Sequence, residues 1–267
     1  MASTAARPLV LPPPTACLVG SDDETNIPAA LLRAPCDLEV LIPARNEARR
    51  LPSTLEHTVR YLEAQPYSAS VVVVDNGSVD QTPDLAARTW SERVPVHLTG
   101  CASPGKGAAV RRGFLTSQAR FIGYMDADLA TPIETLDVVM PLLREYPAVV
   151  GSRWVTGAVF AKRRSVHRSI GGIVFRAMAR RVLPGVADTQ CGFKFFDGDV
   201  ARAVASRLRI DGFAFDVELL REVTGLGAGV REVPVVWTDG GGSTLRMIRD
   251  GTRAAVDLRG IARRRPA

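Results

Sequence analysis

Short apolar runs alternate along the chain with segments of helical periodicity. Four runs of β-branched and aromatic residues are expected to form strands: residues 38–43, 71–75, 94–98 and 121–125. After the first run, apolar residues recur at spacings of three and four, as on one face of a helix: Leu51, Leu55, Val59 and Leu62. Helices are also expected around Leu85 and across Val110 and Phe114. This alternation predicts the α/β class, with a doubly wound, mostly parallel sheet and helices on both faces.

The same pattern divides the 267 residues into one folded domain and two flanking segments. Residues 1–36 are rich in Pro, Ala and small polar residues without periodicity, which predicts a disordered N-terminal arm. The α/β pattern covers residues 37–250, and residues 251–267 are expected to form a basic C-terminal helix or tail. A domain of this length can bury one large core by itself.

The apolar pattern and the cysteines also indicate the cellular compartment of the protein. No stretch of the sequence reaches the roughly 20 apolar residues that a spanning helix needs, and Pro12, Pro13 and Pro14 interrupt the apolar segment near the N-terminus. The four Cys residues have neither the spacing of a zinc site nor the density of a secreted disulfide scaffold. We therefore expect a cytoplasmic protein, with peripheral attachment to the inner face of a membrane as an open alternative.

The net charge of the chain indicates which classes of partner it could bind. Lys and Arg number 34 against 28 Asp and Glu, which gives a formal net charge of +6, and nearly all of the basic residues are Arg. A basic surface suits phosphates, acidic lipids and nucleic acids. Composition alone leaves these three open.

Polar segments follow three of the predicted strands. They are Pro43-Ala44-Arg45-Asn46-Glu47, Asp75-Asn76-Gly77-Ser78 and Asp126-Ala127-Asp128. In open α/β sheets, ligands bind outside the carboxyl ends of the strands, so we expect these segments to line one site. Taken singly, the second segment also suits a turn that caps a helix, and the third suits an acidic surface loop.

The pair Asp126 and Asp128 indicates a divalent metal. Two carboxylates one residue apart repel each other unless a cation lies beside them, and such hard oxygen ligands suit Mg²⁺ or Mn²⁺. A metal held there would in turn hold a diphosphate. The segment Pro104-Gly105-Lys106-Gly107 precedes a helix, where backbone amides and the Lys106 ammonium can face a phosphate, although the same four residues also suit an ordinary loop.

In this order, the motifs resemble those of family 2 glycosyltransferases with the GT-A fold. The likeness covers residues 37–250 and includes three further segments: Gly151-Ser152-Arg153, Asp188-Thr189-Gln190-Cys191-Gly192-Phe193-Lys194 and Phe213-Ala214-Phe215-Asp216-Val217-Glu218-Leu219. These later segments resemble the polyprenyl-phosphate branch, especially the dolichyl-phosphate glucosyltransferases. The resemblance implies transfer of a sugar from a nucleotide diphosphate sugar to a polyprenyl phosphate.

The resemblance also implies residue roles. It puts Pro43, Asn46 and Glu47 around the base and ribose of the donor, and Asp75 and Asn76 near the base. The other donor-binding residues that it implies are Ala44, Arg45, Gly105, Lys106, Asp126 and Ala127. Asp126 and Asp128 are expected to hold the metal and the diphosphate.

Two positions depart from the family pattern. The family often has Asp where Asn76 stands, which bears on nucleotide preference. The mannosyl relatives have Gln where Ala130 stands, so one metal ligand of those relatives is missing here. The run that begins at Asp126 resembles the glucosyl branch instead, which favours a UDP-sugar over a GDP-sugar.

The chemistry of the acceptor decides whether a base is needed. A metal on the diphosphate stabilises the leaving group while the acceptor attacks the anomeric carbon from the opposite face, so one displacement inverts the configuration. A hydroxyl acceptor needs a carboxylate base, for which Asp216 or Glu218 is the candidate. A phosphate acceptor is already an anion and needs only to be held. Both acids also suit the first turn of an ordinary helix.

Arginines indicate where an anionic acceptor would bind. One basic amphipathic helix is expected from the spacing of Arg164, Arg168, Arg176 and Arg180, and a second over residues 245–265. Such helices suit an anionic bilayer and equally suit a solvated face in an Arg-rich protein. Arg153 and Arg168 lie in family-like motifs and are the candidates for binding the acceptor phosphate.

The segment between these helices has two expected features. Residues 233–237 are expected to form a strand, and Gly240-Gly241-Gly242-Ser243 a hinge that closes over substrate or a simple turn.

Three functions therefore follow from the sequence. The first is an inverting, metal-dependent glycosyltransferase that uses a UDP-sugar, with glucose as the expected sugar, and a polyprenyl phosphate. The second keeps this donor chemistry and uses a soluble small-molecule acceptor. The third is a non-catalytic module that binds membrane surfaces or nucleic acid through its basic helices. The third accounts for the arginines but not for the acidic strand ends, and we expect no nucleic-acid partner.

Overall fold

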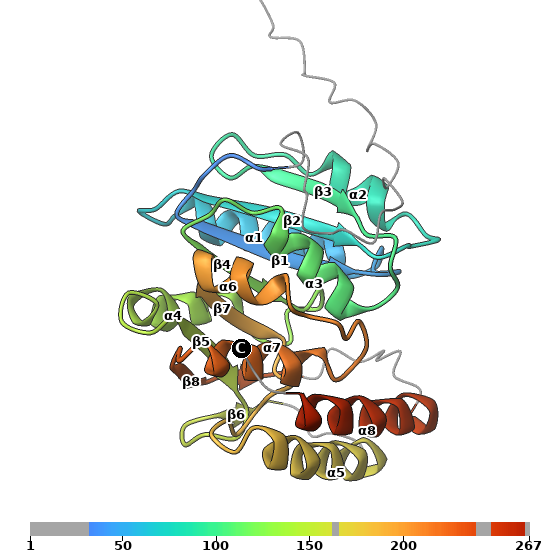
Figure 1. The fold of residues 1–267 in the computed structure, drawn as a ribbon. Coiled ribbons are helices and arrows are strands. Elements are labelled where there is room, and N and C mark those ends of the chain that lie inside the picture. Colours follow the sequence, from blue (N-terminus) through green and yellow to red (C-terminus); the bar gives the residue numbers. More distant parts are fainter. Residues whose placement is uncertain (1–31, 162–165, 239–246, 265–267) are drawn as a thin grey trace, which may run out of the picture.

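The computed structural model describes residues 32–161, 166–238 and 247–264, and within 166–171 and 247–252 it describes the backbone only. A seven-stranded sheet forms the centre of the molecule, in the order β3-β2-β1-β4-β7-β5-β8 (Figure 1). Its strands are β1 Leu38–Ala44, β2 Ala69–Asp75, β3 Val96–Gly100, β4 Phe121–Met125, β5 Ala148–Ser152, β7 Phe193–Asp197 and β8 Val230–Pro234. All neighbouring strands pair in parallel except β7, which runs antiparallel to both β4 and β5.

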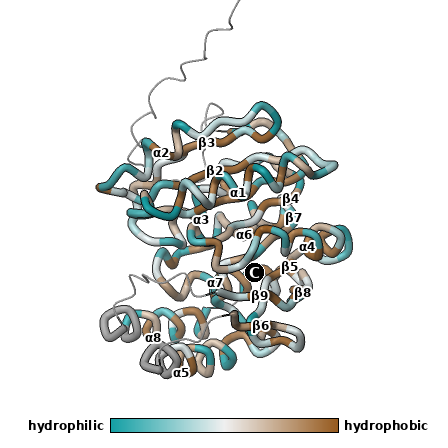
Figure 2. Tube along the Cα trace, turned by 180° about the vertical axis from the view of Figure 1, so that it is seen from behind, coloured by the Kyte–Doolittle hydropathy of each residue, from teal (hydrophilic) through white to brown (hydrophobic). Residues whose placement is uncertain are grey.

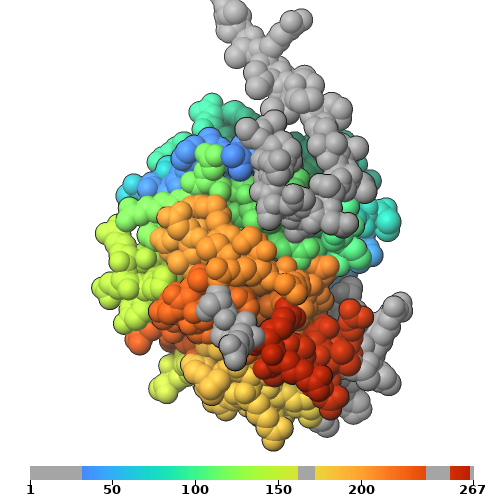
Figure 3. Space-filling model, viewed as in Figure 1, coloured from blue at the N-terminus to red at the C-terminus, as the bar shows by residue number. Residues whose placement is uncertain are grey.

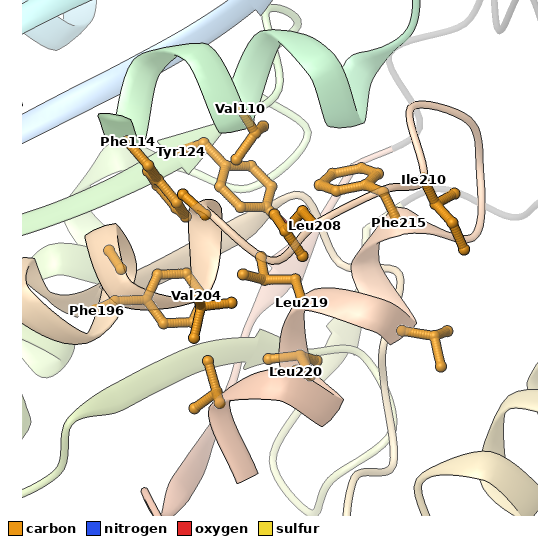
Figure 4. Packing of buried hydrophobic residues seen from close by; sticks show 14 of the residues in the cluster. Val110, Phe114, Tyr124, Phe196, Val204, Leu208, Ile210, Phe215, Leu219 and Leu220 are labelled. Atoms are coloured by element: carbon orange, nitrogen blue, oxygen red, sulfur yellow. The ribbon is translucent and has the colours of Figure 1, made fainter. Parts of the chain in front are cut away.

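Helices cover both faces of this sheet (Figure 1). They are α1 Leu51–Glu63, α2 Thr82–Arg88, α3 Lys106–Leu115, α4 Leu136–Leu142, α5 Val166–Val182, α6 Gly198–Ala205, α7 Phe215–Gly225 and α8 Met247–Arg263, with a short 3₁₀ helix η2 at Ile133–Thr135. Two separate apolar cores result because parallel strands are buried on both faces. One core joins α1, α2 and α4 to the sheet, and the other joins α3, α5, α6, α7 and α8 to its opposite face. Figure 4 shows part of the second core, where Phe114, Tyr124, Phe196 and Phe215 pack with aliphatic side chains. The predicted doubly wound α/β class is confirmed.

Most of the expected elements form where the periodicity placed them. The residues Leu51, Leu55, Val59 and Leu62 all lie on the buried face of α1. Strand β4 matches the predicted run, but β3 begins two residues later than expected, at Val96. The expected strand at 233–237 divides in two. Its first part ends β8, and Val236–Trp237 forms β9, which pairs in parallel with β6, Val159–Phe160, in a separate two-stranded sheet. The division falls at Val235, whose N–H donates to the Ser152 carbonyl of β5 while its own carbonyl accepts from the Val159 N–H of β6.

Both predicted domain boundaries need correction. Arg33 lies in the expected arm, yet its guanidinium pairs with the fully buried Glu39 of β1 and donates to Thr116 and Gly113. The boundary at residue 250 falls inside α8, and Ala254, Leu258 and Ile261 of this helix belong to the second core. The folded domain therefore includes Arg33 and continues through α8. Residues 1–31 and the expected hinge at 240–243 lie outside the described residues.

One end of the molecule is built from β6, β9, α5 and α8. Figure 1 and the reverse view in Figure 2 both place β6 beside α5 and α8, at the end away from β3. In the part of the chain that the structure describes, no helix is both long and apolar enough to cross a bilayer.

Candidate active site

The predicted polar segments meet at one edge of the sheet. Strands β1, β2, β4 and β5 run in the same direction, so their carboxyl ends share that edge. The antiparallel β7 begins there, which brings Gly192 beside Asp126: the Asp126 backbone N–H donates to the Gly192 carbonyl at 3.0 Å. The fold thus brings the acidic segment at Asp126 together with the motif that contains Gly192, more than 60 residues later in the chain.

Side chains join the loop after β1 to the loop after β2. Asn46 has a left-handed backbone, with φ of 56°. Its N–H donates to Ser78 Oγ at 2.9 Å, and its Oδ1 accepts from the Val79 N–H at 2.9 Å. The Glu47 N–H donates to Thr82 Oγ1 at 2.8 Å. These bonds hold the two loops against each other.

The other predicted residues of the first loop differ in exposure. Pro43 is half-buried and Ala44 is buried at the strand end, whereas Arg45 is exposed at the edge. Both carboxylate oxygens of Glu47 accept from Arg50, at 2.6 and 2.7 Å. The Glu47 carboxylate is therefore already engaged by Arg50 in this structure.

Asp75 ends β2 with one carboxylate oxygen still to be satisfied. Its Oδ2 accepts from the Ser78 N–H at 3.3 Å. Its Oδ1 is buried and has no hydrogen-bond partner among the described residues. Because leaving a buried acceptor unpaired is costly, this oxygen suits a ligand that carries an N–H donor.

Asn76 holds the loop that carries Lys106. Its Nδ2 donates to the Ser103 carbonyl at 2.7 Å, and its Oδ1 accepts from the Gly105 N–H at 2.6 Å. The side chain is buried, so its role in this structure is to fix that loop rather than to face the donor base. A carboxylate at this position could accept from Gly105 but could not donate to Ser103, which gives the departure from the family pattern a physical consequence.

The Lys106 ammonium lies on Asp126, with Nζ 2.5 Å from Oδ1. A Cβ at Gly192 would come within 2.0 Å of Asp126 Oδ2, so only glycine leaves room for this carboxylate. Burial opposes the charge on Lys106, but the negative charges of Asp126 and Asp216 raise its pKa. Gly105, with φ of 129°, allows the sharp turn into α3 against the Asp211 carbonyl.

Asp128 faces the same edge and is short of positive charge. Burial and the neighbouring Asp126 carboxylate raise its pKa, although a hydrogen bond from the Ala130 N–H at 3.1 Å opposes this shift. Arg50 Nη1 stands 3.9 Å from its Oδ2. Ala127, between the two acids, is buried, and its carbonyl accepts from Thr54 Oγ1 at 2.8 Å.

These two carboxylates fit a divalent cation. Within the described residues, no group of three or more His, Cys, Asp or Glu side chains could enclose a metal by itself. Mg²⁺ commonly binds through one or two carboxylates and completes its shell with substrate phosphates and water. Burial is the main cause of the raised pKa of Asp128, and the Asp126 charge adds to it; a cation between the two carboxylates would relieve that second contribution.

Behind Asp126 lies a buried ionic chain. The Lys194 ammonium is fully buried on β7 and donates to Asp216 Oδ1 and to the Cys191 carbonyl, both at 2.5 Å. Tyr124 donates its hydroxyl to the same Asp216 oxygen. The Tyr124 ring lies 5.3 Å from each of the Lys106 and Lys194 ammonium nitrogens. These contacts therefore link Asp126, through Lys106 and the Tyr124 ring, to Asp216 at the start of α7.

Burial argues against the predicted general bases. The Glu218 side chain is 2% exposed, accepts from the N–H groups of Arg209 and Ile210, and pairs with Arg264 at 2.5 Å. It anchors the loop before α7 and the end of α8, and this engagement argues against Glu218 as the base. Asp216 is 6% exposed and already holds Lys194 and Tyr124.

Arg153 and Asp188 form a second buried pair. Arg153 donates from Nε and Nη2 to the two oxygens of Asp188, at 2.7 and 2.9 Å. Burial opposes ionisation of Asp188, but the hydrogen bonds and charge of Arg153 keep the pKa of this carboxyl below its usual value. The pair places Arg153 at the carboxyl end of β5, on the edge that carries the aspartates. The backbone of Arg168 lies in α5, and its side chain is outside the described residues.

Fold and site together define a nucleotide-sugar enzyme: the pattern of the glycosyl transferase family 2 matches residues 39–204, and this chain belongs to that family. It is 32% identical over 237 residues to the dolichyl-phosphate beta-glucosyltransferase of Dictyostelium discoideum, across 83% of this chain and 72% of that protein. It is 35% identical over 225 residues to the Mus musculus dolichyl-phosphate beta-glucosyltransferase, across 78% of this chain and 69% of that protein.

A solved structure supports the fold independently. Glucosyl-3-phosphoglycerate synthase from Mycobacterium tuberculosis, in complex with Mn²⁺, uridine diphosphate and glucosyl-3-phosphoglycerate, matches with a TM-score of 0.63 at 18% identity. The match covers 85% of this chain and 80% of that one. The expected GT-A fold is thereby confirmed.

Several residues of the site were not foreseen from the sequence. Lys194 stands between Phe193 and Phe195 in an otherwise apolar run, and a lysine in such a run indicates a buried ion pair. The sequence around Tyr124 does not indicate its role, because an aromatic residue in a strand is common. The Arg50 contact with Glu47 follows an i, i+3 spacing that could have been noticed.

Proposed function

We propose that this chain transfers glucose from UDP-glucose to a polyprenyl phosphate, with inversion at the anomeric carbon. The observation that carries the donor half is the convergence at one sheet edge of the unpaired Asp75 oxygen with the Asp126 and Asp128 carboxylates. The acceptor half rests on the relatives, which are named dolichyl-phosphate beta-glucosyltransferases.

Each end of the donor has matching groups. Uracil presents an N–H donor, which suits the buried Oδ1 of Asp75. The joined loops after β1 and β2 supply the backbone edge against which the base and ribose would lie. At the other end, Mg²⁺ or Mn²⁺ on Asp126 and Asp128 would neutralise the diphosphate as it leaves. Lys106, which pairs with Asp126, would supply a positive charge to a phosphate oxygen.

A phosphate acceptor fits the burial of the acids. An anionic oxygen needs no general base, and neither Asp216 nor Glu218 is exposed enough to serve an incoming hydroxyl. We assign Asp216 a positioning role, in which it holds Tyr124 and Lys194 behind Asp126. Arg153, together with Arg168 of α5, remains our proposal for binding the acceptor phosphate. Because the donor is a soluble nucleotide sugar, we place the reaction at the cytoplasmic face of a membrane.

The test is a matrix of donors and acceptors. UDP-glucose, UDP-galactose and GDP-mannose are each incubated with a short, water-soluble prenyl phosphate or with 3-phosphoglycerate, with and without Mn²⁺, and released nucleotide diphosphate is measured. We expect metal-dependent release only with UDP-glucose and the prenyl phosphate, and a β-linked product by NMR. Release that depends on 3-phosphoglycerate would establish a soluble acceptor, and equal release without metal after chelation would remove the metal from the proposal.

A further inference from the structure

One segment of the chain accounts for its net positive charge. Between Glu145 and Asp188 the sequence contains no Asp or Glu, and its basic residues are Arg153, Lys162, Arg163, Arg164, Arg168, Arg176, Arg180 and Arg181. In the rest of the chain, the remaining Lys and Arg are fewer than the Asp and Glu, so this segment accounts for the whole net charge of +6. The segment contains β5, β6 and α5, of which β6 and α5 lie at one end of the molecule (Figure 1). Among its basic residues, the described side chains on α5 are Arg176, Arg180 and Arg181, and the last two are exposed.

The same end exposes large apolar side chains. Half of the exposed large apolar residues in the described part of the chain belong to it: Trp154, Val159, Phe160, Ile173, Val174 and Val236. Their exposed fractions run from 40% to 54%. We call this set the apolar end surface. Figure 3 shows α5 at the lower end of the molecule, on the outside of the fold.

Contacts join the members of this surface across separate elements. The Trp154 and Phe160 rings have centroids 5.5 Å apart. The Arg176 guanidinium lies 3.8 Å above the Trp154 ring, which ties α5 to the loop after β5. Ile173 lies one helical turn before Arg176, on the same side of α5. Val236 is paired with Val159 in the β6–β9 sheet. The Arg176 cation therefore lies directly among the apolar side chains of this surface.

The surface is continuous with the active site. Trp154 follows Arg153, whose guanidinium lies 5.6 Å from the centre of the Trp237 ring in β9. Just beyond β9, the Thr238 N–H donates to the Ala130 carbonyl at 2.9 Å, two residues after Asp128. A body resting on the apolar end surface would thus lie next to the edge that carries the aspartates.

We propose that the apolar end surface docks this enzyme on an anionic lipid bilayer. Tryptophan, phenylalanine and aliphatic side chains partition into the interfacial layer of a membrane, while arginines beside them attract acidic headgroups. A nucleic acid would match the arginines but would leave the exposed Ile173 and Val174 in water. Docking deepens the proposed function, because a polyprenyl phosphate lies in the same bilayer. The evidence for docking is nevertheless independent of that function, since it comes from the apolar end surface.

Matched substitutions test the proposal. Val174 of α5 and Val138 of α4 are both 54% exposed, and Val138 lies outside the apolar end surface. Sedimentation with vesicles of phosphatidylcholine and phosphatidylglycerol should bind wild type and Val138→Asp equally, with about tenfold weaker partitioning for Val174→Asp. Phe160→Ser, on a different element, should also weaken binding. Pure phosphatidylcholine or high salt should release the wild type.

Two results would overturn the docking proposal. One is equal binding by the two Asp variants, and the other is wild-type binding that does not depend on anionic lipid. Transfer to a short, soluble prenyl phosphate is measured in parallel, without vesicles, and should be the same for Val174→Asp and wild type. If that transfer occurs but docking fails, the proposed function stands alone. If docking depends on Val174 but no acceptor is glucosylated, docking stands and the proposed function fails.

Discussion

At the scale of single residues, the two carboxylates after β4 have different surroundings. Asp126 is compensated by Lys106 at 2.5 Å, whereas among the described residues the cation paired with Asp128 is Arg50 at 3.9 Å. Asp128→Ala should therefore remove metal binding and, among the ion pairs of the described residues, break only the long contact with Arg50. We expect a loss of at least about a hundredfold in UDP release, because charge on the leaving group is no longer neutralised.

Manganese binding provides the second measurement for Asp128→Ala. Electron paramagnetic resonance of Mn²⁺ with UDP should show loss of the bound ion, while circular dichroism stays unchanged. The matched control is Asp199→Ala, whose side chain is 94% exposed at the opposite edge of the sheet. Turnover of Asp128→Ala within about twofold of wild type would contradict the assignment of the metal.

Substitutions at Asp216 can show whether this residue acts as a general base or only positions its neighbours. Asp216→Asn should lower the free energy of unfolding by about 3 to 5 kcal/mol, because the fully buried Lys194 loses its partner charge. The double variant Lys194→Met, Asp216→Asn should recover most of this stability, since no uncompensated charge remains. If Asp216 only positions its neighbours, the double variant keeps transfer within about tenfold of wild type. A general base would instead cost about 10² to 10⁴ in the rate of both variants, and their rate would rise with pH.

At the scale of elements, Asn76 decides the shape of the loop before α3. Asn76→Ala removes both hydrogen bonds that hold Ser103 and Gly105, so we expect the KM for UDP-glucose to rise about tenfold with little change in kcat. Asn76→Asp keeps the bond from the Gly105 N–H and loses the other, and it should show a smaller rise. Calorimetric titration with UDP checks the order of affinities. An Asn76→Asp affinity equal to that of wild type would mean that the Ser103 bond has no part in donor binding.

At the scale of the whole molecule, the Arg153–Asp188 pair joins β5 to the chain that enters β7. The pKa of Asp188 is held below its usual value of 3.8, so the ionised carboxylate stabilises the fold. This contribution is fully present above that value and is lost as the pH falls through the lower pKa of the folded state. Asp188→Asn should lower the free energy of unfolding at pH 7 by about 3 to 5 kcal/mol, because Arg153 is left buried without its anion.

Urea unfolding from pH 7 to pH 3 measures this difference. The gap between wild type and Asp188→Asn should stay constant down to about pH 4 and shrink below it. The exposed Asp199→Asn serves as control and should change stability by less than about 0.5 kcal/mol at pH 7. A gap that widens in acid would reverse the sign and refute the role of this pair.

The local pattern was enough to predict the α/β class, the helix α1 and the strands β1, β2 and β4. Alternation and helical spacing are properties of neighbouring residues, so they survive without knowledge of the rest of the chain. For the same reason, the polar segments after those strands could be assigned to one edge. Parallel strands direct their carboxyl ends to the same side, and Asp75, Asp126 and Asp128 lie there as expected.

Only the tertiary structure decided which of these groups are available for chemistry. Asp216 and Glu218 stand in a typical acidic first turn of a helix, and nothing local reveals that Lys194 and Arg264 bind them in the interior. Likewise, Arg33 lies in a segment without periodicity and is held by Glu39, a partner that only folding brings near. Composition predicted the basic character of the chain, but the meeting of β6, β9 and α5 placed Arg176 beside exposed tryptophan, phenylalanine and valine. Burial and pairing between distant segments depend on the packing of the whole domain, and for that reason no local pattern of residues contains them.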